Sequence, residues 1–466
     1  MDSKKGGYEF YRDVLGSPKF IVAPMVDQSE LAWRILARRY GSQLVYTPMI
    51  SAKMFADSKH PQHRKDDMFD LTHGEEGGPL DRPLVVQFCA NDPQALLTAA
   101  MAVQDRCDAV DINFGCPQDI ARRGRYGSFL QDEWDLIYNL INILHKNLKV
   151  PVTAKFRIFP DVNKTVAYAQ MMERAGAQIL TCHGRIREQR GQNSGLADWA
   201  QIAAVKAAVK VPVFANGNIL YHSDIARCLE VTKADGVMSA EGQLYNAALF
   251  AQTTPTSGEE AASGLHPPHA DLALEYLDIV ESLKTHTAMS AIKGHLFKLM
   301  RPGLLKELDL RDRLGKIGKG TTLNDIRDLV LEMKSRMERD ANAATALEST
   351  IIDDPNLAGT KIVPHWLAQP YFRPLPTPEQ IAAMEKKRER SKSHQGPAQL
   401  KEKPVGVAEA SPTELHDSAE PQNGVSAEQP SGVPISNLGK RSAEESSVEV
   451  AVEDSIKKLK ETPSLS

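Results

Sequence analysis

The chain has 466 residues, of which 42% are hydrophobic, and its 56 Lys and Arg stand against 60 Asp and Glu, for a formal net charge of −4. A chain of this length can bury a large core, and we expect more than one domain. The sequence shows no charged-then-apolar leader and no apolar run of membrane-spanning length, so we expect a protein that is neither secreted nor bound to a membrane.

The five cysteines lie far apart, and no two of them form a Cys-x-x-Cys pair. This spacing argues against a disulfide framework and against a zinc site, so we predict no bound metal. Reduced thiols fit a cytosolic or nuclear compartment.

The charges are divided unevenly along the chain. From residue 346 onward there are 14 Lys and Arg and 18 Asp and Glu, which leaves 42 residues of each sign before it. Because that larger part is neutral overall, evidence for nucleic-acid binding has to come from local clusters of charge.

Between residues 19 and 252, short apolar runs alternate with amphipathic stretches. The runs are rich in Val, Ile, Leu and Phe without clean alternation, which is typical of parallel strands buried on both faces. Eight strand–helix units of this length predict an α/β fold, a (β/α)₈ TIM barrel, after an N-terminal extension over 1–18. A doubly wound open sheet is the alternative, but no Gly-x-Gly-x-x-Gly follows an early strand. The predicted strands are Lys19–Pro24, Gln43–Thr47, Leu84–Cys89, Ala109–Asn113, Val152–Arg157, Ile179–His183, Val211–Asn216 and Gly236–Ala240.

Helical patterns follow the barrel. A segment rich in Pro, Gly, Ser and Thr over 253–269 is interpreted as a linker. From 270 to 345 the pattern is helical, with an apolar stripe that includes Ala273, Tyr276 and Leu277. We therefore predict a small all-α helical bundle domain.

The last part of the chain is expected to divide in two. Trp366, Tyr371 and Phe372 bring too much apolar surface for a free tail, since each buried aromatic covers about 150–250 Å². We expect the segment 346–376 to dock onto the folded body. From 377 to 466 the composition turns to Glu, Lys, Ser, Pro and Gln, which predicts a disordered C-terminal tail.

Polar or small residues stand at the end of seven of the eight predicted strands. In a TIM barrel, the carboxyl ends of the strands form the active-site face. A site at that face is therefore expected to contain Pro24-Met25, Gln87, Asn113 with Cys116, Lys155 and Arg157, His183, Asn216-Gly217-Asn218 and Ala240-Glu241-Gly242.

The residue types at these ends match flavin mononucleotide (FMN). An inward-pointing Lys155 can place a positive charge beside an electron-rich ring. The amides of Gln87 and Asn113 can pair with a ring that has donor and acceptor edges. Gly217 and Gly242 let the backbone approach a phosphate after strands seven and eight. The alternatives are a Lys155 held in a structural salt bridge and a His183 that only satisfies its turn.

Cys116 follows directly after the fourth strand, in a Gly-Cys-Pro turn. A free thiol has a pKa of roughly 8.5, so it is mostly protonated near neutrality and can give a proton to carbon. With a lowered pKa it would instead be a nucleophile. The sequence leaves both roles open.

Together these residues resemble the tRNA-dihydrouridine synthases. The resemblance covers about 19–300, and stretches such as Ala23–Ala37 and Gln87–Pro93 are similar to the eukaryotic type-1 branch, which acts on D-loop uridines 16 and 17. The motifs are Ala23-Pro24-Met25-Val26-Asp27, Val86-Gln87, Asp111-Ile112-Asn113-Phe114-Gly115-Cys116-Pro117, Lys155-Phe156-Arg157, His183-Gly184-Arg185 and Asn216-Gly217-Asn218.

The resemblance implies a role for each matching position. Cys116 donates a proton to uracil C5 while reduced flavin gives hydride to C6, Asn113 and Arg157 hold the target base, and NADPH supplies the electrons. The residues implied to line the FMN are Pro24, Met25, Val26, Gln87, Lys155, His183, Asn216, Gly217, Asn218, Ala240 and Glu241.

Two positions depart from the family pattern. Many relatives have Gly-Arg where this chain has Ala240-Glu241, and Asp is common where it has Asn218. A carboxylate beside a phosphate is unfavourable, so we expect phosphate binding to rest on backbone amides with Glu241 turned away.

Basic clusters near the predicted site indicate tRNA as the partner. Arg122 and Arg123 follow Cys116, and Arg185 and Arg187 follow His183; these four are predicted to bind the substrate. Lys293, His295 and Lys298, at helical spacing, are interpreted in the same way. We expect a monomer. A small-molecule FMN reductase and a non-catalytic tRNA-binding protein remain as alternatives.

Overall fold

Eight parallel strands form the centre of the structure, a computed structural model that describes residues 4–57, 69–191, 194–252, 264–354 and 359–371. Their order in the sheet is β1-β9-β8-β7-β6-β5-β4-β2. A parallel bridge between Ile21 and Leu44 joins the two end strands. The sheet therefore closes on itself, and the predicted TIM barrel is confirmed over the open sheet. The strands are β1 (Phe20–Val22), β2 (Val45–Tyr46), β4 (Leu84–Cys89), β5 (Ala109–Phe114), β6 (Val152–Arg157), β7 (Leu180–His183), β8 (Val213–Asn216) and β9 (Gly236–Ser239), and the short β3 (Ile50–Ser51) pairs with β4.

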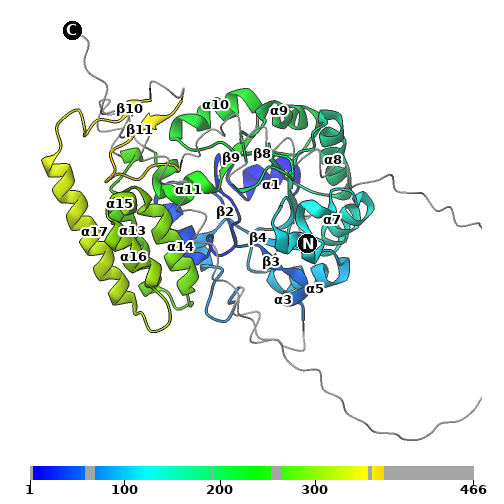
Figure 1. Cartoon of the computed structure of the whole chain (residues 1–466). Helices are drawn as coiled ribbons and strands as arrows, with labels where there is room; N and C mark the ends of the chain where they lie inside the picture. Colours follow the sequence, from blue (N-terminus) through cyan, green and yellow to red (C-terminus); the bar gives the residue numbers. More distant parts are fainter. Residues whose placement is uncertain (1–3, 58–68, 192–193, 253–263, 355–358, 372–466) are drawn as a thin grey trace, which may run out of the picture. The chain divides into compact units, whose positions relative to one another are not determined.

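Helices surround this barrel (Figure 1). Several begin where the sequence offers a side-chain cap: Asp92, Asp161 and Asp198 each accept a hydrogen bond from a backbone N–H of the first turn. The long outer helices are α2 (Leu31–Arg39), α5 (Pro93–Val103), α7 (Trp134–Asn147), α8 (Val162–Ala175), α9 (Trp199–Ala208) and α10 (His222–Thr232). Short helices stand in the connections: α3 (Ala52–Phe55), α6 (Asp119–Gly124) and α11 (Glu241–Tyr245), with 3₁₀ turns η1 (Gly78–Asp81), η2 (Gly127–Leu130) and η4 (Ala247–Phe250).

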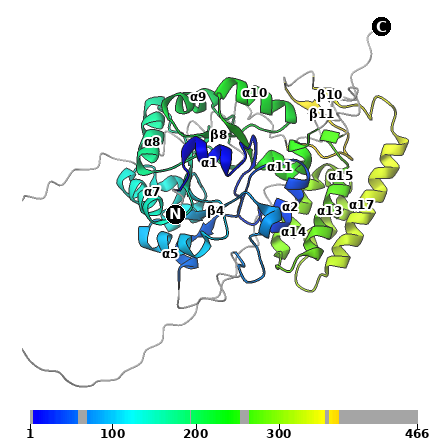
Figure 2. The ribbon, with the colours of Figure 1, turned by 180° about the vertical axis from the view of Figure 1, so that it is seen from behind.

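A helix not anticipated from the sequence, α1 (Gly7–Asp13), lies within the N-terminal extension. Phe10 and Tyr11 are buried against inward-facing barrel residues such as Phe214 and Met238. In Figure 2, α1 lies over the strands. The extension thus closes the end of the barrel opposite to the predicted site. Its short length gives no helical period that a sequence pattern could reveal.

The helical domain follows the barrel (Figure 1), as predicted. The predicted stripe of Ala273, Tyr276 and Leu277 is fully buried. The domain packs against the barrel through α13 and α2, and through α14 and α11. Its helices are α13 (His269–Ser282), α14 (Met289–Leu299), α15 (Arg301–Lys306), α16 (Leu308–Lys316) and α17 (Leu323–Ala343).

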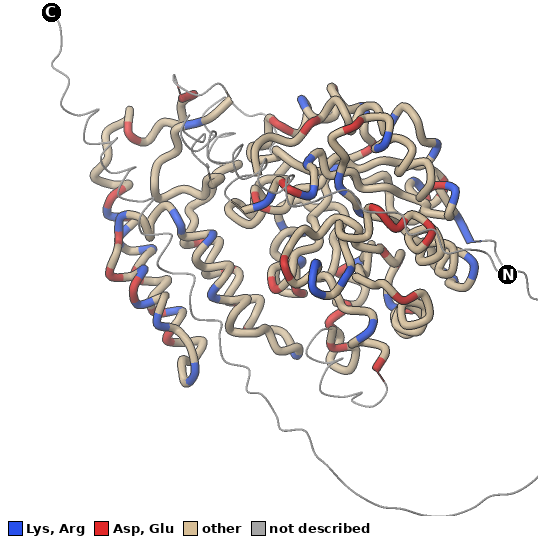
Figure 3. The backbone as a smooth tube through the Cα atoms, turned by 45° about the vertical axis from the view of Figure 1, so that its right-hand side comes forward, with Lys and Arg blue, Asp and Glu red and all other residues tan. Residues whose placement is uncertain are grey.

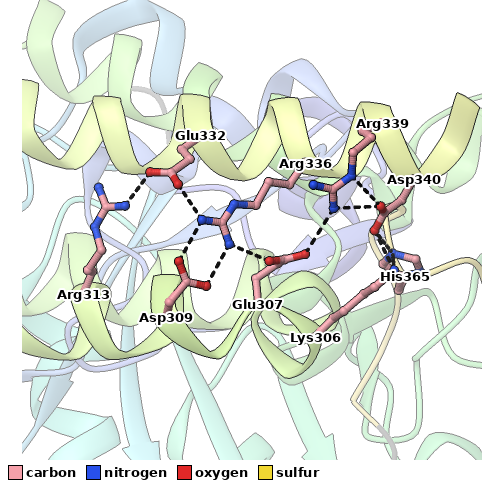
Figure 4. A network of polar contacts seen from close by, with 9 residues as sticks. All are labelled: Lys306, Glu307, Asp309, Arg313, Glu332, Arg336, Arg339, Asp340 and His365. Atoms are coloured by element: carbon pink, nitrogen blue, oxygen red, sulfur yellow. Dashed lines mark hydrogen bonds and ion pairs between the residues drawn. The ribbon is translucent and has the colours of Figure 1, made fainter.

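Ion pairs join α17 to α15 and α16 (Figure 4). Arg336 contacts Glu307 at 2.6 Å, Asp309 at 2.7 Å and Glu332 at 2.6 Å. Figure 3 shows positive and negative residues interleaved along α17. Because the positive groups of this network already have carboxylate partners, this face offers little excess charge to RNA.

The segment 359–371 lies against both the barrel and the helical domain. Its backbone pairs with the chain just before α13: Ala368 N donates to Pro267 O at 2.8 Å, and Trp366 O accepts from the His269 N–H at 3.2 Å. The ring of Tyr371 stacks on Tyr245 of α11, with centroids 5.6 Å apart. Strand β11 (Lys361–Ile362), within this segment, forms a small antiparallel pair with β10 (Ile352–Asp353).

Phe372 and the predicted disordered tail lie outside the described residues. Within the described ranges, no helix combines the length and the apolarity that crossing a membrane requires.

Candidate active site

The polar strand ends meet at one mouth of the barrel. The strand register places Asn113 beside Lys155, Arg157 beside His183, and His183 beside Asn216. Gln87 on β4 lies beside Asp111 on β5. Because these positions alternate with the apolar residues that face the helices, their side chains project into the barrel.

Asn113 fixes the backbone of the turn that carries Cys116. Its Oδ1 accepts hydrogen bonds from Gly115 N at 3.0 Å and Cys116 N at 2.8 Å. Its Nδ2 donates to Gln87 Oε1 at 2.9 Å, and Gln87 Nε2 donates to Asp111 Oδ2 at 2.7 Å. The amides of Asn113 and Gln87 thus contribute to a network inside the protein, and Asp111 is a member that the sequence reasoning missed.

Cys116 is held from its carbonyl side as well. Its carbonyl oxygen accepts from Ser128 N at 3.1 Å and Ser128 Oγ at 2.9 Å. Gly127 (φ +64°) passes so close that a Cβ there would lie 2.7 Å from the Cys116 carbonyl oxygen. Burial raises the pKa of the Cys116 thiol, against the lowering effect of Arg157 and Lys155. The thiol is therefore protonated near neutrality, which favours the acid over the nucleophile.

Lys155 is half-buried at the mouth, and its Nζ donates to Asn216 Oδ1 at 2.8 Å. Burial lowers the pKa of Lys155 to about 8, with Arg157 adding to the effect. Among the described residues, no carboxylate comes within salt-bridge distance of its ammonium group, so the alternative of a structural salt bridge is not observed. The charge of Asp111 acts on Lys155 only from beyond salt-bridge distance, so this cation is suited to an anionic ligand.

His183 and Arg185 form a pair at the end of β7. Arg185 Nη1 lies 3.1 Å from His183 Nε2 and its Nη2 donates to Asn218 Oδ1 at 2.8 Å. Burial, followed by the charges of Arg157, Lys155 and Arg185, holds the pKa of His183 well below its ordinary value. His183 is therefore neutral, with Nε2 as the acceptor.

Arg157 joins two loops by hydrogen bonds. Its Nε donates to Gly115 O at 2.8 Å, and its Nη1 donates to Ile186 O at 3.0 Å and Gln189 O at 2.9 Å. These bonds join the Cys116 turn to the loop after β7. The residue predicted to hold the target base thus also shapes the site.

The loops after β8 and β9 come into close contact at Gly242. A Cβ at Gly242 would lie 2.2 Å from Ile219 O, so only glycine fits there. Gly217 (φ +116°) and Asn218 (φ +61°) take the left-handed backbone conformation. Ala240 precedes α11, and Glu241 is its first residue.

The loop after β1 completes the ring of predicted cofactor positions. It carries Pro24, Met25 and Val26, and Ser29 Oγ accepts from Met25 N at 3.0 Å. Val26 is 56% exposed, which leaves its side chain available for contact with a ligand.

The arginines predicted to bind the substrate tRNA differ in exposure and in their contacts. Arg122 and Arg123 lie exposed on α6. Arg187 is half-buried, 3.5 Å from Asp132. Arg190 links the two loops by donating to Pro117 O at 3.0 Å. Arg185 belongs to the cofactor side of the mouth.

The members of the helical-domain cluster make contacts within the protein. His295 is fully buried and stacks on Trp33 with centroids 4.1 Å apart. Lys293 donates to Ile317 O at 3.0 Å and Lys298 to Gln28 Oε1 at 2.7 Å. His295 is therefore closed to RNA, while Lys293 and Lys298 are half-buried and bonded within the protein; helical spacing does not tell which of the three side chains is buried.

No group of three or more metal-ligating side chains occurs in the described ranges. A TIM barrel whose mouth holds a half-buried lysine, a neutral histidine and a protonated thiol is a barrel enzyme equipped for proton transfer beside a bound anion. Comparison with known proteins identifies it further: the dihydrouridine synthase family model matches residues 21–328, and the chain belongs to this family.

Its relatives carry a consistent description. The chain is 49% identical to the tRNA-dihydrouridine(16/17) synthase [NAD(P)(+)] of Saccharomyces cerevisiae over 371 residues, covering 78% of this chain and 85% of that protein. It is 46% identical to the corresponding "-like" protein of Rattus norvegicus, covering 80% of this chain and 78% of that protein. For the Schizosaccharomyces pombe protein the identity is 44%, covering 81% and 94%.

Proposed function

We propose that this chain reduces uridine in tRNA to 5,6-dihydrouridine, at D-loop positions 16 and 17, with FMN as its cofactor and NADPH as the reductant. Membership of the dihydrouridine synthase family and the printed names of the relatives support the reaction and the positions. The observation that carries the proposal is the Cys116 turn, which Asn113 and Ser128 fix at the barrel mouth beside Lys155.

The residues at the mouth fit FMN. No described residue accepts a hydrogen bond from the backbone N–H of Gly217, Asn218 or Ile219, and buried amides of this kind normally have a partner. A phosphate after these strands would supply acceptors. When bound, reduced FMN supplies the hydride for uracil C6.

The other proposed cofactor residues surround that position. Lys155 would place its charge beside the ring, and the neutral His183 and the Gln87 amide would face its edge. The loops with Pro24, Met25, Val26, Asn216, Ala240 and Glu241 would complete the cofactor site.

Cys116 would deliver the proton to uracil C5. Asn113 and Ser128 hold the turn from both sides, so the thiol stays at one place while the base enters. Arg157 keeps the turn and the loop after β7 together and lies where it can contact the base. A uracil has to leave its stack to reach this mouth.

For tRNA itself we propose contacts at Arg122, Arg123 and Arg187, on the two loops that Arg190 joins. We further propose a monomer in the cytosol or nucleus. All five cysteines are free thiols, which is consistent with a reducing compartment.

The test is a dihydrouridine assay on tRNA with purified protein, FMN and NADPH. The wild type should convert D-loop uridines. Cys116→Ala should keep flavin reduction but lose dihydrouridine formation by about 10²–10⁴-fold, the usual contribution of a general acid. The matched control is Cys89→Ala, a buried thiol at the end of the neighbouring strand β4.

Each alternative makes its own prediction in this assay. A small-molecule reductase would consume NADPH but leave tRNA unmodified. A non-catalytic tRNA-binding protein would bind tRNA, bind no flavin and be indifferent to Cys116→Ala. Either result would overturn the proposed function.

A further inference from the structure

The hydrogen bonds that hold Cys116 trace back to one carboxylate inside the barrel. Asp111 is fully buried on β5. Its Oδ1 accepts from Thr153 Oγ1 at 2.6 Å, and its Oδ2 accepts from Gln87 Nε2. The bonds then continue through Gln87 and Asn113 to the backbone of Cys116.

Asp111 sets the direction of this relay from one end, and the backbone N–H groups of Gly115 and Cys116, which can only donate, require the same direction at the other end. A side-chain amide can be turned in two ways, but an ionised carboxylate can only accept. Gln87 must therefore turn its NH₂ group to Asp111 and its carbonyl to Asn113. Asn113 must in turn direct its NH₂ group to Gln87, which leaves its carbonyl for the N–H of Cys116. Reversing one amide would set two donors or two acceptors face to face.

We infer that Asp111 is a positioning residue, whose carboxylate sets the direction of the Gln87–Asn113 relay and thereby holds the Cys116 turn at the barrel mouth. Its importance for the reaction rests on the proposed function, in which Cys116 is the acid. The relay itself is a property of the free protein and can be tested without tRNA or flavin.

Packing alone does not account for a carboxylate at this position. Burial raises the pKa of Asp111 to about 6, against the opposing effects of Thr153, Gln87 and the charge of Lys155. The charge of Asp111 also adds to the effect of burial in raising the pKa of Tyr46 on β2. An apolar residue would fill the space without this desolvation cost, but it could not accept from Gln87.

The reactivity of the Cys116 thiol reports whether the turn is held. Among the five cysteines, Cys116 is half-buried and the other four are buried. Alkylation of the folded protein by iodoacetamide, located by mass spectrometry, therefore measures the exposure and order of this turn. A loosened turn should react faster at constant pH.

The decisive experiment reverses the relay. In Asn113→Asp, a carboxylate oxygen faces Gln87 Oε1, and turning Gln87 would only move the conflict to Asp111. In Asp111→Asn/Asn113→Asp, the new Asn can donate to Gln87 Oε1, and Gln87 can donate to the new Asp, which still accepts from Cys116 N. The groups of the relay are again satisfied in the double variant, with the two bonds made by Gln87 reversed and the bond from Cys116 N unchanged.

The expected alkylation rates follow from this logic. Asn113→Asp should react about tenfold faster than the wild type, since buried polar groups are left without partners. The double variant should return to within about twofold of the wild type. Asp111→Leu should also react faster than the wild type, because Gln87 Nε2 then loses its acceptor. Asp111→Asn keeps an acceptor oxygen for Gln87 and should stay close to the wild type, because the Thr153 hydroxyl can rotate to accept from the new NH₂ group. Thr153→Val is the packing control and should also stay close, since it leaves the direction of the relay unchanged.

Two results would overturn the inference: an unchanged rate in Asn113→Asp, or a double variant that reacts as fast as the single one. If Asn113→Asp does not fold, recovery of folded protein by adding Asp111→Asn is the same test, and failure to recover overturns the inference. The proposed function fails separately, by the absence of dihydrouridine with the wild type.

Discussion

At the residue scale, the mouth of the barrel holds positive charge that is partly withdrawn from water even without a ligand. Lys155 has an amide oxygen but no carboxylate within bonding distance, and Arg157 beside it adds to the unfavourable charge. Such a site costs the empty protein stability and is compensated when an anionic ligand binds.

This imbalance predicts opposite effects of Lys155→Met on stability and on binding. The pKa of Lys155 is lowered to about 8 in the folded state, so the cost of burying the charge is full below pH 8. The cost decreases as pH rises above 8. It is gone above the ordinary pKa of Lys, about 10.4, because Lys155 is then neutral in both the folded and the unfolded state. At pH 7, Lys155→Met without flavin should melt at least about 2 °C higher than the wild type.

The same variant should bind FMN at least about tenfold more weakly, as the loss of a buried charge partner implies. Calorimetric melting and flavin fluorescence titration check the two effects. A lower melting temperature together with unchanged FMN affinity would show that Lys155 is structural.

The sequence indicates which side chains reach this mouth but not how they contact one another. Cys116, Lys155 and His183 stand at the carboxyl ends of strands, and the end of a strand can be found from its apolar run. That Arg157 donates to carbonyls of two loops, or that Ser128 holds the Cys116 carbonyl, depends on loops that meet only in the folded chain. Asp111 could have been found, because it lies two positions before Asn113 and therefore points to the same side of β5.

At the element scale, apolar runs predicted the strands well, whereas helical spacing did not tell which side chains of α14 are buried. A strand buried on both faces needs apolar residues throughout, so its position is visible in the sequence. A helix such as α14 can direct Lys293 inward as readily as outward when its ammonium group finds the carbonyls at the end of α16.

The element that should contact tRNA is α6, together with the loop after β7. Arg122→Gln/Arg123→Gln/Arg187→Gln should weaken tRNA binding and reduce the slope of log K against log salt by about 2–3, since each phosphate contact contributes about 0.7–0.9. Flavin binding should not change. Titrations at several salt concentrations measure the slope.

Lys293→Gln is the matched control for lost positive charge. It should lower the melting temperature, because Ile317 O loses its donor, without changing the salt slope. An unchanged slope in the triple arginine variant would place the RNA on another surface.

At the scale of the whole molecule, the chain after the helical domain returns to the barrel. The segment 359–371 bonds to the backbone of Pro267 and His269, and Arg301 lies over the Tyr371 ring at 4.1 Å. His365 is 3.0 Å from Asp340 of the ion-pair network in Figure 4. These contacts connect residues far apart in the sequence, so the spacing of aromatic residues was the only signal of them.

Truncation separates this segment from the residues after it. Ending the chain after 376 should leave the melting temperature unchanged. Ending it after 358 should lower the melting temperature by several degrees. This truncation removes the buried Val363 and Ala368, together with the backbone bonds to Pro267 and His269. Equal melting temperatures for the two truncations would contradict a stabilising role.

The interface between the barrel and the helical domain lies directly behind the proposed cofactor loops. Glu30, just after the loop with Met25 and Val26, accepts from Tyr276 OH at 2.8 Å and lies 3.1 Å from His295 Nε2. Lys298 of α14 donates to Gln28 on the same loop. Burial lowers the pKa of Lys298, and the charge of Glu241 on α11 opposes that shift.

Lys298 is therefore placed to offset Glu241, the carboxylate that stands beside the proposed phosphate position. Lys298→Met should weaken FMN binding by about tenfold, the size expected for one partly buried charge. Binding of riboflavin, which has no phosphate, should stay unchanged. Glu241→Gln should have the opposite effect on FMN affinity and strengthen the binding. Lys293→Met on the same helix is the control for packing and should affect neither ligand. Equal weakening of FMN and riboflavin by Lys298→Met would mean that this lysine supports the domain interface alone, and that the helical domain takes no part in holding the phosphate.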